Sequence, residues 1–206
     1  MQRLFFVRHG KTELNQGNFV QGAGIDSLLL EESRKDALKT GRYLDAQAIK
    51  HVIVSPQQRA VQTAELITRE FSSPFTVDYI EGFKEMDYGD WEGLHIPEVE
   101  KKFPTLFHHL RNRPELYDPA EIHAESYEDL TQRGRQTIYD ALETYPDEDI
   151  LFVGHSILIM CTVLSLTGKE VKDYRSVTPL NNTSITVLSY NNDHFTLDIW
   201  NGTSHL

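Results

Sequence analysis

Two histidines each come at the end of an apolar run, and both have a glycine beside them. His9 follows closely on the run Leu4–Val7, and His155 follows closely on the run Leu151–Val153. Apolar runs of this length are typical of strands that are buried on both faces of a parallel sheet. Polar residues after such strands fall at the carboxyl ends, where open α/β sheets bind their ligands. If the two strands are neighbours, the two imidazoles face each other across one pocket.

Arginines accompany these histidines, and together they indicate phosphoryl chemistry. Arg8 precedes His9, while Ser55-Pro56 is typical of a helix start, with the serine as N-cap, and places Arg59 in the first turn. A guanidinium group can donate two N–H groups at once to phosphoryl oxygens. A neutral imidazole nitrogen can attack phosphorus. We therefore predict that His9 is a nucleophile, with its other ring nitrogen donating to a backbone carbonyl. We predict that Arg8, Arg59 and His155 stabilise the transferring oxygens.

A phosphoryl-transfer site also needs a carboxylic acid that protonates the departing alkoxide. The segment 81–93 is acidic, punctuated by glycine and rich in aromatic residues, which predicts an ordered loop. Spacing alone does not choose among its carboxylates, which include Glu81, Glu85, Asp87 and Glu92.

A long segment without periodicity follows the first histidine. Gly10 is expected to let the backbone turn and a ligand approach, and Lys11–Ser27 is longer than most connections, which suggests a binding role. Within it, Asn15, Gln21 and Gly22 offer side-chain and backbone donors to an anion. Without its neighbours, this segment would be interpreted as an ordinary turn-rich loop.

Length and composition limit the classes of protein that this chain can represent. Its 206 residues suit one α/β domain. The formal net charge of −11 argues against nonspecific binding to nucleic acid or to an anionic membrane, since both require a basic surface. The single cysteine, Cys161, lies in an apolar run and cannot form an internal disulfide, and no signal peptide or membrane-spanning run is visible. We expect a cytoplasmic protein.

Periodicity predicts the elements that position these residues. The sequence predicts helices over 31–48, from Ser55-Pro56 to about 71, and over 97–113, 126–145 and 157–167; it predicts strands over 4–8, 49–54, 75–79 and 149–153, with a hairpin of 183–190 and 194–200. We interpret the region from about 96 to 125 as an insertion that covers the site. Its adjacent pair His108-His109 predicts no metal site, because neighbouring residues on a helix point apart.

Four segments of the chain, in order, resemble the motifs of the histidine phosphatase superfamily. The similarity is to the branch that includes cofactor-dependent phosphoglycerate mutase, and it extends over nearly the whole chain. The segments are Arg8-His9-Gly10 with Thr12 and Asn15, Ser55-Pro56-x-x-Arg59-Ala60-x-Gln62-Thr63-Ala64, Glu85-x-x-x-Gly89-x-Trp91-Glu92-Gly93, and Gly154-His155-Ser156.

The resemblance implies a single domain over residues 1–206 with a three-layer α/β fold, in which helices flank a mainly parallel sheet. It implies that His9 is the phosphorylated nucleophile and that Glu85 is the proton donor and acceptor. It further implies a phosphate pocket formed by Arg8, Arg59 and His155, and a substrate-binding loop with Asn15, Gln21 and Gly22. It implies no metal ion and no cofactor.

The expected activity is hydrolysis of a small phosphomonoester through a phosphohistidine intermediate. Phosphoglycerate mutase-type transfer is the alternative within the same chemistry. The resemblance implies that mutases of the family have longer chains and a fuller lid, so the short length of this chain favours hydrolysis. A non-catalytic phosphate-binding regulatory module is a third interpretation, disfavoured because nucleophile, acid and arginines are all present. Some positions depart from the family pattern, including Lys11 after the first motif and His123-Ala124 before Glu125. The sequence predicts neither the exact substrate nor the oligomeric state.

Overall fold

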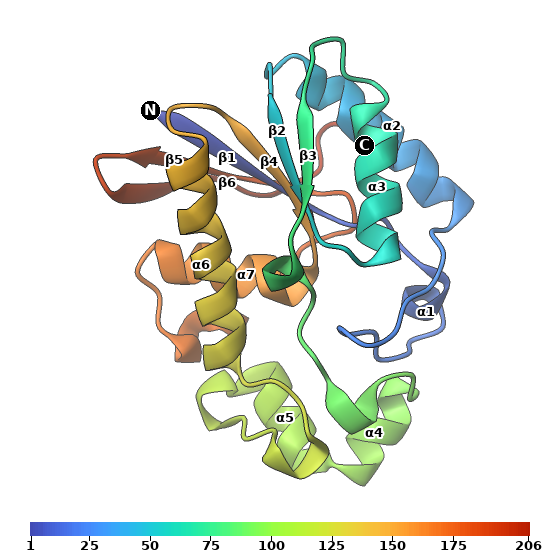
Figure 1. Cartoon of the computed structure of the whole chain (residues 1–206). Helices are drawn as coiled ribbons and strands as arrows, with labels where there is room; N and C mark the ends of the chain where they lie inside the picture. Colours follow the sequence, from blue (N-terminus) through green and yellow to red (C-terminus); the bar gives the residue numbers. More distant parts are fainter.

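A six-stranded sheet forms the centre of the molecule. The computed structural model describes all 206 residues, and Figure 1 shows the sheet with helices on both of its faces. The strand order is β3-β2-β4-β1-β5-β6. The strands are β1 (Gln2–Arg8), β2 (His51–Val54), β3 (Thr76–Tyr79), β4 (Ile150–Gly154), β5 (Ile185–Asn191) and β6 (His194–Gly202).

Four of the six strands run parallel, as predicted. β1 pairs with β4, β4 with β2 and β2 with β3, all in parallel. The predicted hairpin of β5 and β6 is also confirmed, with β5 antiparallel to β1. The register places Arg8 opposite Gly154. The residues that follow them, His9 and His155, therefore leave the sheet side by side at its carboxyl edge.

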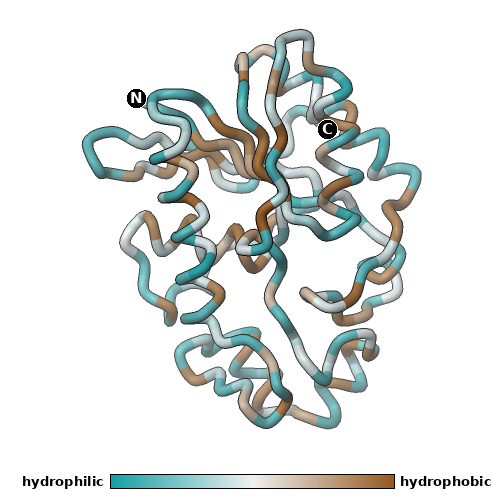
Figure 2. The backbone as a smooth tube through the Cα atoms, viewed as in Figure 1, coloured by the Kyte–Doolittle hydropathy of each residue, from teal (hydrophilic) through white to brown (hydrophobic).

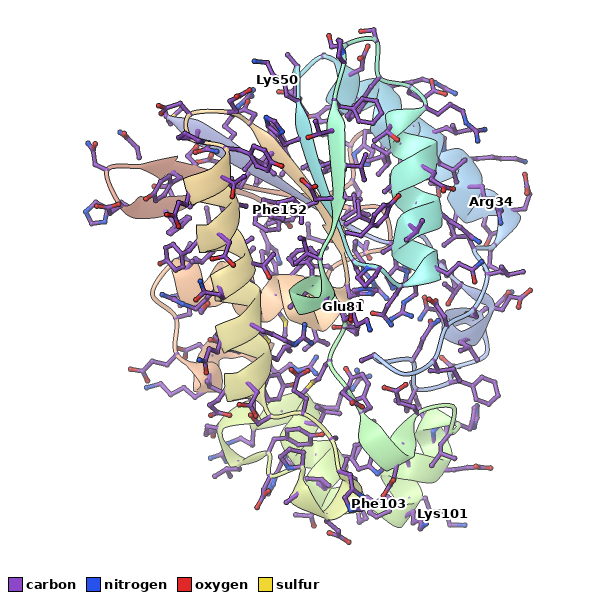
Figure 3. All side chains as sticks on the ribbon, viewed as in Figure 1. Arg34, Lys50, Glu81, Lys101, Phe103 and Phe152 are labelled. Carbon is purple, nitrogen blue, oxygen red and sulfur yellow. The ribbon has the colours of Figure 1, made fainter.

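Helices cover each face of the sheet because side chains alternate along the strands. Phe5 and Val7 belong to a core under α2 and α3, whereas Phe6 stacks on Phe152 in a second core with α6 and α7. Figure 2 shows that the strands at the centre of the sheet are coloured as hydrophobic. Figure 3 shows Phe152 at the centre of the molecule. The α-helices are α1 (Glu13–Gln16), α2 (Glu31–Asp45), α3 (Gln58–Thr68), α4 (Ile96–Lys102), α5 (Pro104–Asn112), α6 (Tyr127–Thr144) and α7 (Ser156–Leu166).

Two of the long helices are formed as expected from their sequences. Ser126 caps α6, since its Oγ accepts a hydrogen bond from the backbone N–H of Asp129 at 3.0 Å. α7 is apolar on nearly all sides and carries Cys161, which is fully buried. Burial raises the pKa of the Cys161 thiol, which disfavours the reactive thiolate.

The segment that begins at Ile96 lies beyond the carboxyl edge of the sheet, at the bottom of Figure 1. It contains α4 and α5, followed by the 3-10 turns Pro114–Leu116 and Ala120–Ile122. The prediction of one helix over 97–113 was wrong, because the helix is interrupted at Phe103. The residue before a proline is disfavoured in the helical region, and Phe103 precedes Pro104 with φ −126° and ψ 55°.

Two further predictions about local structure were wrong. The segment Lys11–Ser27 is not entirely a loop, since it contains the short α1, which begins with a capping box at Thr12. The helix α3 begins at Gln58, and Ser55 is not its N-cap. The Ser55 side chain contacts His155 instead, and its backbone N–H donates to Val153. No helix in the chain is both long and apolar enough to cross a membrane.

Candidate active site

His9 is held by backbone contacts on both of its sides. Its N–H donates to the carbonyl of Gly154 at 2.9 Å, and Asn182 Nδ2 donates to its carbonyl at 2.9 Å. The ring Nδ1 lies 2.7 Å from the carbonyl oxygen of Gly10. Because a carbonyl only accepts, Nδ1 must carry the hydrogen, as the sequence analysis predicted. The Nε2 atom therefore keeps a free lone pair on a side chain that lines a cavity.

His155 lies next to His9, and the centroids of the two rings are 5.2 Å apart. Its Nε2 is 2.7 Å from Ser55 Oγ, which also accepts the backbone N–H of Gln57 at 3.4 Å. We assign to His155 the tautomer in which the Ser55 hydroxyl, which has no other acceptor, donates to Nε2, so that Nδ1 carries the hydrogen. That Nδ1–H group is buried without a partner.

Both imidazoles are neutral at neutral pH. Burial lowers the pKa of His9 and of His155 well below the usual range, and the positive charge of Arg59 lowers both further. For His9 the charge of Arg8 adds to this effect. A neutral ring is the form in which Nε2 of His9 can act as a nucleophile.

Two arginines lie beside the histidines, each with an unused donor. Arg8 lines the cavity, and its Nη1 donates to the carbonyl of Leu180 at 2.6 Å. Arg59 is fully buried and, like His155, does not line the cavity; its Nη1 contacts Asp26 at 3.0 Å and its Nη2 donates to the carbonyl of Gly22 at 3.0 Å. On both side chains Nε is buried and has no acceptor. Arg59 lies in the first turn of α3, as predicted.

The three predicted residues of the N-terminal loop differ in their access to the cavity. Asn15 and Gln21 both line it, and Asn15 Nδ2 is 3.4 Å from Gln21 Oε1. Gly22 does not line it, and its carbonyl accepts the side chain of Gln57 at 2.7 Å. A Cβ at Gly22 would lie 2.5 Å from the carbonyl oxygen of Met86, so close backbone packing requires glycine here.

Gly10 has a packing role that differs from the prediction of a sharp turn. Its φ is not positive, and an added Cβ would lie only 2.9 Å from Ser33 Cβ in α2. The glycine therefore permits the strand end to approach this helix. Its N–H donates to Thr63 Oγ1 of α3 at 3.0 Å, which fixes the backbone that carries His9.

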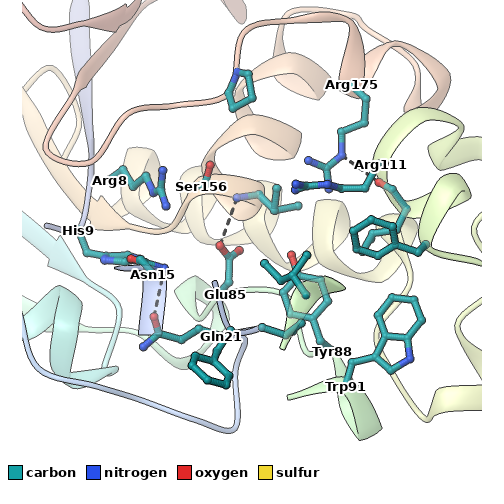
Figure 4. A pocket seen from close by; sticks show the side chains of 17 residues that line it. Arg8, His9, Asn15, Gln21, Glu85, Tyr88, Trp91, Arg111, Ser156 and Arg175 are labelled. Atoms are coloured by element: carbon teal, nitrogen blue, oxygen red, sulfur yellow. Dashed lines mark hydrogen bonds between the residues drawn. The ribbon is translucent and has the colours of Figure 1, made fainter. Parts of the chain in front are cut away.

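Among the four candidate acids, only Glu85 is buried against the cavity. Its Oε1 accepts the backbone N–H groups of Met86 and Leu158, both at 3.0 Å. Its Oε2 accepts the N–H of Ile157 at 3.3 Å, so the carboxyl group lies at the N-terminus of α7 (Figure 4). Glu81 and Asp87 are exposed, and Glu92 is half-buried, outside the residues that line the cavity.

Arg133 of α6 holds the loop that carries Glu85, a role that sequence patterns did not predict. Its Nε and Nη2 donate to the two carboxylate oxygens of Glu125, at 2.6 and 2.9 Å. Its remaining hydrogen bonds reach three carbonyls of the loop, those of Gly82, Lys84 and Glu85. No local pattern marks this arginine, because its three partners in the loop are 48 to 51 residues away in the chain.

The cavity has a volume of about 230 Å³ and extends from His9 towards the segment that begins at Ile96. Figure 4 shows His9 and Arg8 on one side, Glu85 in the middle, and Arg111 and Arg175 on the other side. Neither arginine was predicted from the sequence, because neither belongs to one of the four motifs. The apolar part of the lining consists of Phe19, Val20, Trp91, Ile96, Phe107, Leu110, Ile157 and Pro179.

No group of three or more histidine, cysteine, aspartate or glutamate side chains is arranged to hold a metal ion. His108 is exposed and contacts Asn112 of the same helix. The charges that act most strongly on His9 are those of Arg59 and Arg8, which suit an anion.

The sequence matches a family model over almost its entire length. The model described as "Histidine phosphatase superfamily (branch 1)" matches residues 4–203. The chain belongs to this superfamily. The family resemblance predicted from the four motifs is therefore confirmed.

The relatives of this histidine phosphatase superfamily member include proteins that are named phosphatases and proteins that are named phosphoglycerate mutases. "Uncharacterized phosphatase PhoE" of Bacillus subtilis (strain 168) is 27% identical over 206 residues, which are 100% of this chain and 97% of the relative. "Probable phosphoglycerate mutase GpmB" of Salmonella paratyphi A is 26% identical over 200 residues, 97% of this chain and 90% of the relative. The solved structure of Bacillus stearothermophilus YhfR has a TM-score of 0.93 at 26% identity, covering 100% of this chain and 99% of that chain. This likeness confirms the predicted three-layer fold.

Proposed function

We propose that this protein hydrolyses small phosphomonoesters through a phosphohistidine intermediate on His9. The observation that supports this most directly is a set of three buried donors without acceptors beside a neutral imidazole. They are Nε of Arg8, Nε of Arg59 and Nδ1 of His155. An unsatisfied buried donor costs about 1–3 kcal/mol. Arg8 lines the cavity, and Arg59 and His155 lie close enough to His9 to influence its charge or be influenced by it. A phosphoryl group bound at His9 would bring oxygens to these donors, so that binding of the anion removes their cost.

In the first step, the lone pair of His9 Nε2 attacks phosphorus while the bond to the ester oxygen breaks. The Nδ1–H bond to the Gly10 carbonyl stabilises the positive charge that develops on the ring. Charge on the phosphoryl oxygens is stabilised by Arg8, Arg59 and His155, as such transition states require. The electron pair of the broken bond remains on the departing alkoxide, which must then receive a proton.

Glu85 would supply that proton and later remove one from water. Its Oε1 already accepts two N–H groups, whereas Oε2 accepts a single longer one, so Oε2 is the oxygen that can carry the proton. In the second step, the carboxylate takes a proton from a water whose oxygen attacks phosphorus, and the bond to Nε2 breaks. Inorganic phosphate and the neutral imidazole of His9 are the products of this step.

The dimensions of the cavity favour a small metabolite over a phosphoprotein. Its volume of about 230 Å³ lies slightly below the usual range for small-molecule sites, roughly 300–1,000 Å³. We propose that the insertion of residues 96–125 acts as a lid, since Ile96, Phe107, Leu110 and Arg111 from it line the cavity. This segment would therefore decide which alcohol groups are accepted.

The experiment that tests the proposal is trapping of the intermediate. Wild-type protein is mixed with a ³²P-labelled phosphomonoester and quenched, and we expect a base-stable, acid-labile label on His9. His9→Ala should abolish both label and turnover, whereas His194→Ala, which changes an exposed histidine of β6, should leave both unchanged. Hydrolysis by His9→Ala at more than a few per cent of the wild-type rate would reject the mechanism.

The same assay separates the alternatives. A mutase returns the phosphoryl group to a bound product, and relatives such as GpmB carry that name. Addition of bisphosphoglycerate should therefore accelerate isomerisation of a phosphoglycerate in a mutase, while a phosphatase releases inorganic phosphate with or without it. Binding of phosphate without any turnover would instead favour the non-catalytic module and contradict our proposal.

A further inference from the structure

Two arginines face the cavity at the side opposite His9, and the phosphoryl chemistry uses neither. Arg111 belongs to α5, and Arg175 belongs to the 3-10 segment Val171–Ser176. Figure 4 shows their guanidinium groups close to each other, on the side of the cavity away from Arg8. Neither arginine forms a salt bridge, although the chain has 31 acidic residues against 20 lysines and arginines.

Arg175 is fixed in position through only one of its nitrogens. Its Nε donates to the carbonyl of Leu110 at 3.0 Å and to the hydroxyl of Tyr127 at 2.8 Å, and its Cζ lies 5.7 Å from the centroid of the Tyr127 ring. Both Nη groups lack a hydrogen-bond partner within the chain, and the half-buried side chain lines the cavity. The fork of donors is therefore oriented before any ligand arrives.

Arg111 supplies a second cation at the rim of the same end. Its Cζ lies 5.6 Å from the centroid of the Phe107 ring, and the side chain makes no hydrogen bond. It is exposed, in contrast to Arg175. The two arginines together form a positive end of the cavity without a counter-charge.

The wall between the two ends of the cavity is mostly apolar. Val20, Trp91, Phe107 and Ile157 line it. Tyr88 also lines the cavity, together with Glu85. A ligand that spans the cavity would therefore contact apolar side chains in its middle and cations at both ends.

We propose that the substrate carries a carboxylate at the end remote from its phosphate, joined by an apolar spacer, and that Arg175 and Arg111 bind this carboxylate. The inference rests on the proposed phosphatase function and specifies its substrate class. A carboxylate matches the two parallel N–H groups that a guanidinium presents. Each charge-assisted contact of this kind favours the charged substrate by roughly ten- to a hundredfold in kcat/KM.

The test compares phosphate monoesters of ω-hydroxy acids of increasing chain length with the methyl amides of the same acids. The two members of each pair have the same length and similar leaving groups, and they differ in one charge. We expect the wild-type ratio of kcat/KM, acid over amide, to reach about tenfold or more at one chain length. Arg175→Gln should reduce that ratio at least fivefold.

Two other variants provide a second test of the site and a control for the loss of a positive charge. Arg111→Gln changes an exposed side chain without hydrogen bonds and should also reduce the ratio, even if Arg175→Gln does not fold. Arg69→Gln removes the same charge from an exposed position outside the cavity and should leave the ratio unchanged. Hydrolysis of acids and amides at equal rates at every length overturns this inference alone. Absence of hydrolysis of both, with no phosphohistidine, overturns the proposed function itself.

Discussion

The two neutral histidines make stability depend on pH in a way that can be measured. We predict that His9 and His155 together lower the free energy of unfolding by about 2.7 kcal/mol between pH 7.5 and pH 5.5, and that each contributes about half of this amount. Burial and the nearby charge of Arg59 lower the pKa of both imidazoles in the folded state. In the unfolded chain both rings are solvated and regain their ordinary pKa.

The sign and the magnitude follow from proton linkage. A group with a depressed folded-state pKa binds protons mainly in the unfolded state, so a falling pH stabilises the unfolded chain. For an unfolded-state pKa of about 6.5, protonation stabilises the unfolded chain by about 0.06 kcal/mol per histidine at pH 7.5 and by about 1.4 kcal/mol at pH 5.5. The loss therefore begins as the pH drops through about 6.5, and it continues until the folded-state pKa is reached.

The assay is chemical denaturation at pH 7.5, 6.5 and 5.5, followed by the fluorescence of the tryptophans, of which Trp91 is buried. His9→Asn and His155→Asn should each lose about 1.4 kcal/mol less stability than the wild type over this range. Burial also lowers the pKa of His205, and this contribution cancels when variant and wild type are compared. Most carboxylates titrate below this window.

The interpretation would be refuted by parallel pH profiles. If both variants lost as much stability as the wild type, the two rings would not be the groups that resist protonation. A wild-type stability that is constant from pH 7.5 to 5.5 would mean that His9 and His155 ionise normally in the folded protein. In that case the nucleophile would be lost by protonation at mildly acidic pH.

Three other predictions concern the acid, its support and the absence of a metal. Glu85→Gln should reduce kcat for alkyl phosphates by about 10²–10⁴-fold and for activated aryl phosphates much less; equal losses on both would remove Glu85 from proton transfer. Arg133→Gln should destabilise the protein by about 2–4 kcal/mol, because it leaves Glu125 and three loop carbonyls without their donor; a change below 1 kcal/mol in denaturation would contradict this. Activity should survive incubation with a chelator such as EDTA, and loss that is restored by a divalent cation would indicate a metal enzyme.

The sequence alone determined the parts of the site that depend on local pattern. Strands buried on both faces are continuously apolar, so the ends of β1 and β4 could be located from composition, and with them His9 and His155. The cap of α6 at Ser126 was predictable for the same reason, since an N-cap interacts only with the next turn. The family motifs then predicted Glu85 among several carboxylates that spacing left equivalent, and Glu85 is the one that is buried against the cavity.

Tertiary structure decided what depends on contacts between distant segments. Ser55 has the local signature of a helix cap, but a hydrogen bond to His155, 100 residues away, uses its side chain differently. Arg133 and Arg175 lie outside any motif, because their partners and the cavity come together only when the helices pack on the sheet. Sequence periodicity reports which face of an element is buried, whereas the direction of a long polar side chain is set by the neighbours it finds after folding. The end of the cavity that Arg111 and Arg175 line is therefore a property of the fold, while the end at His9 could be predicted from the chain itself.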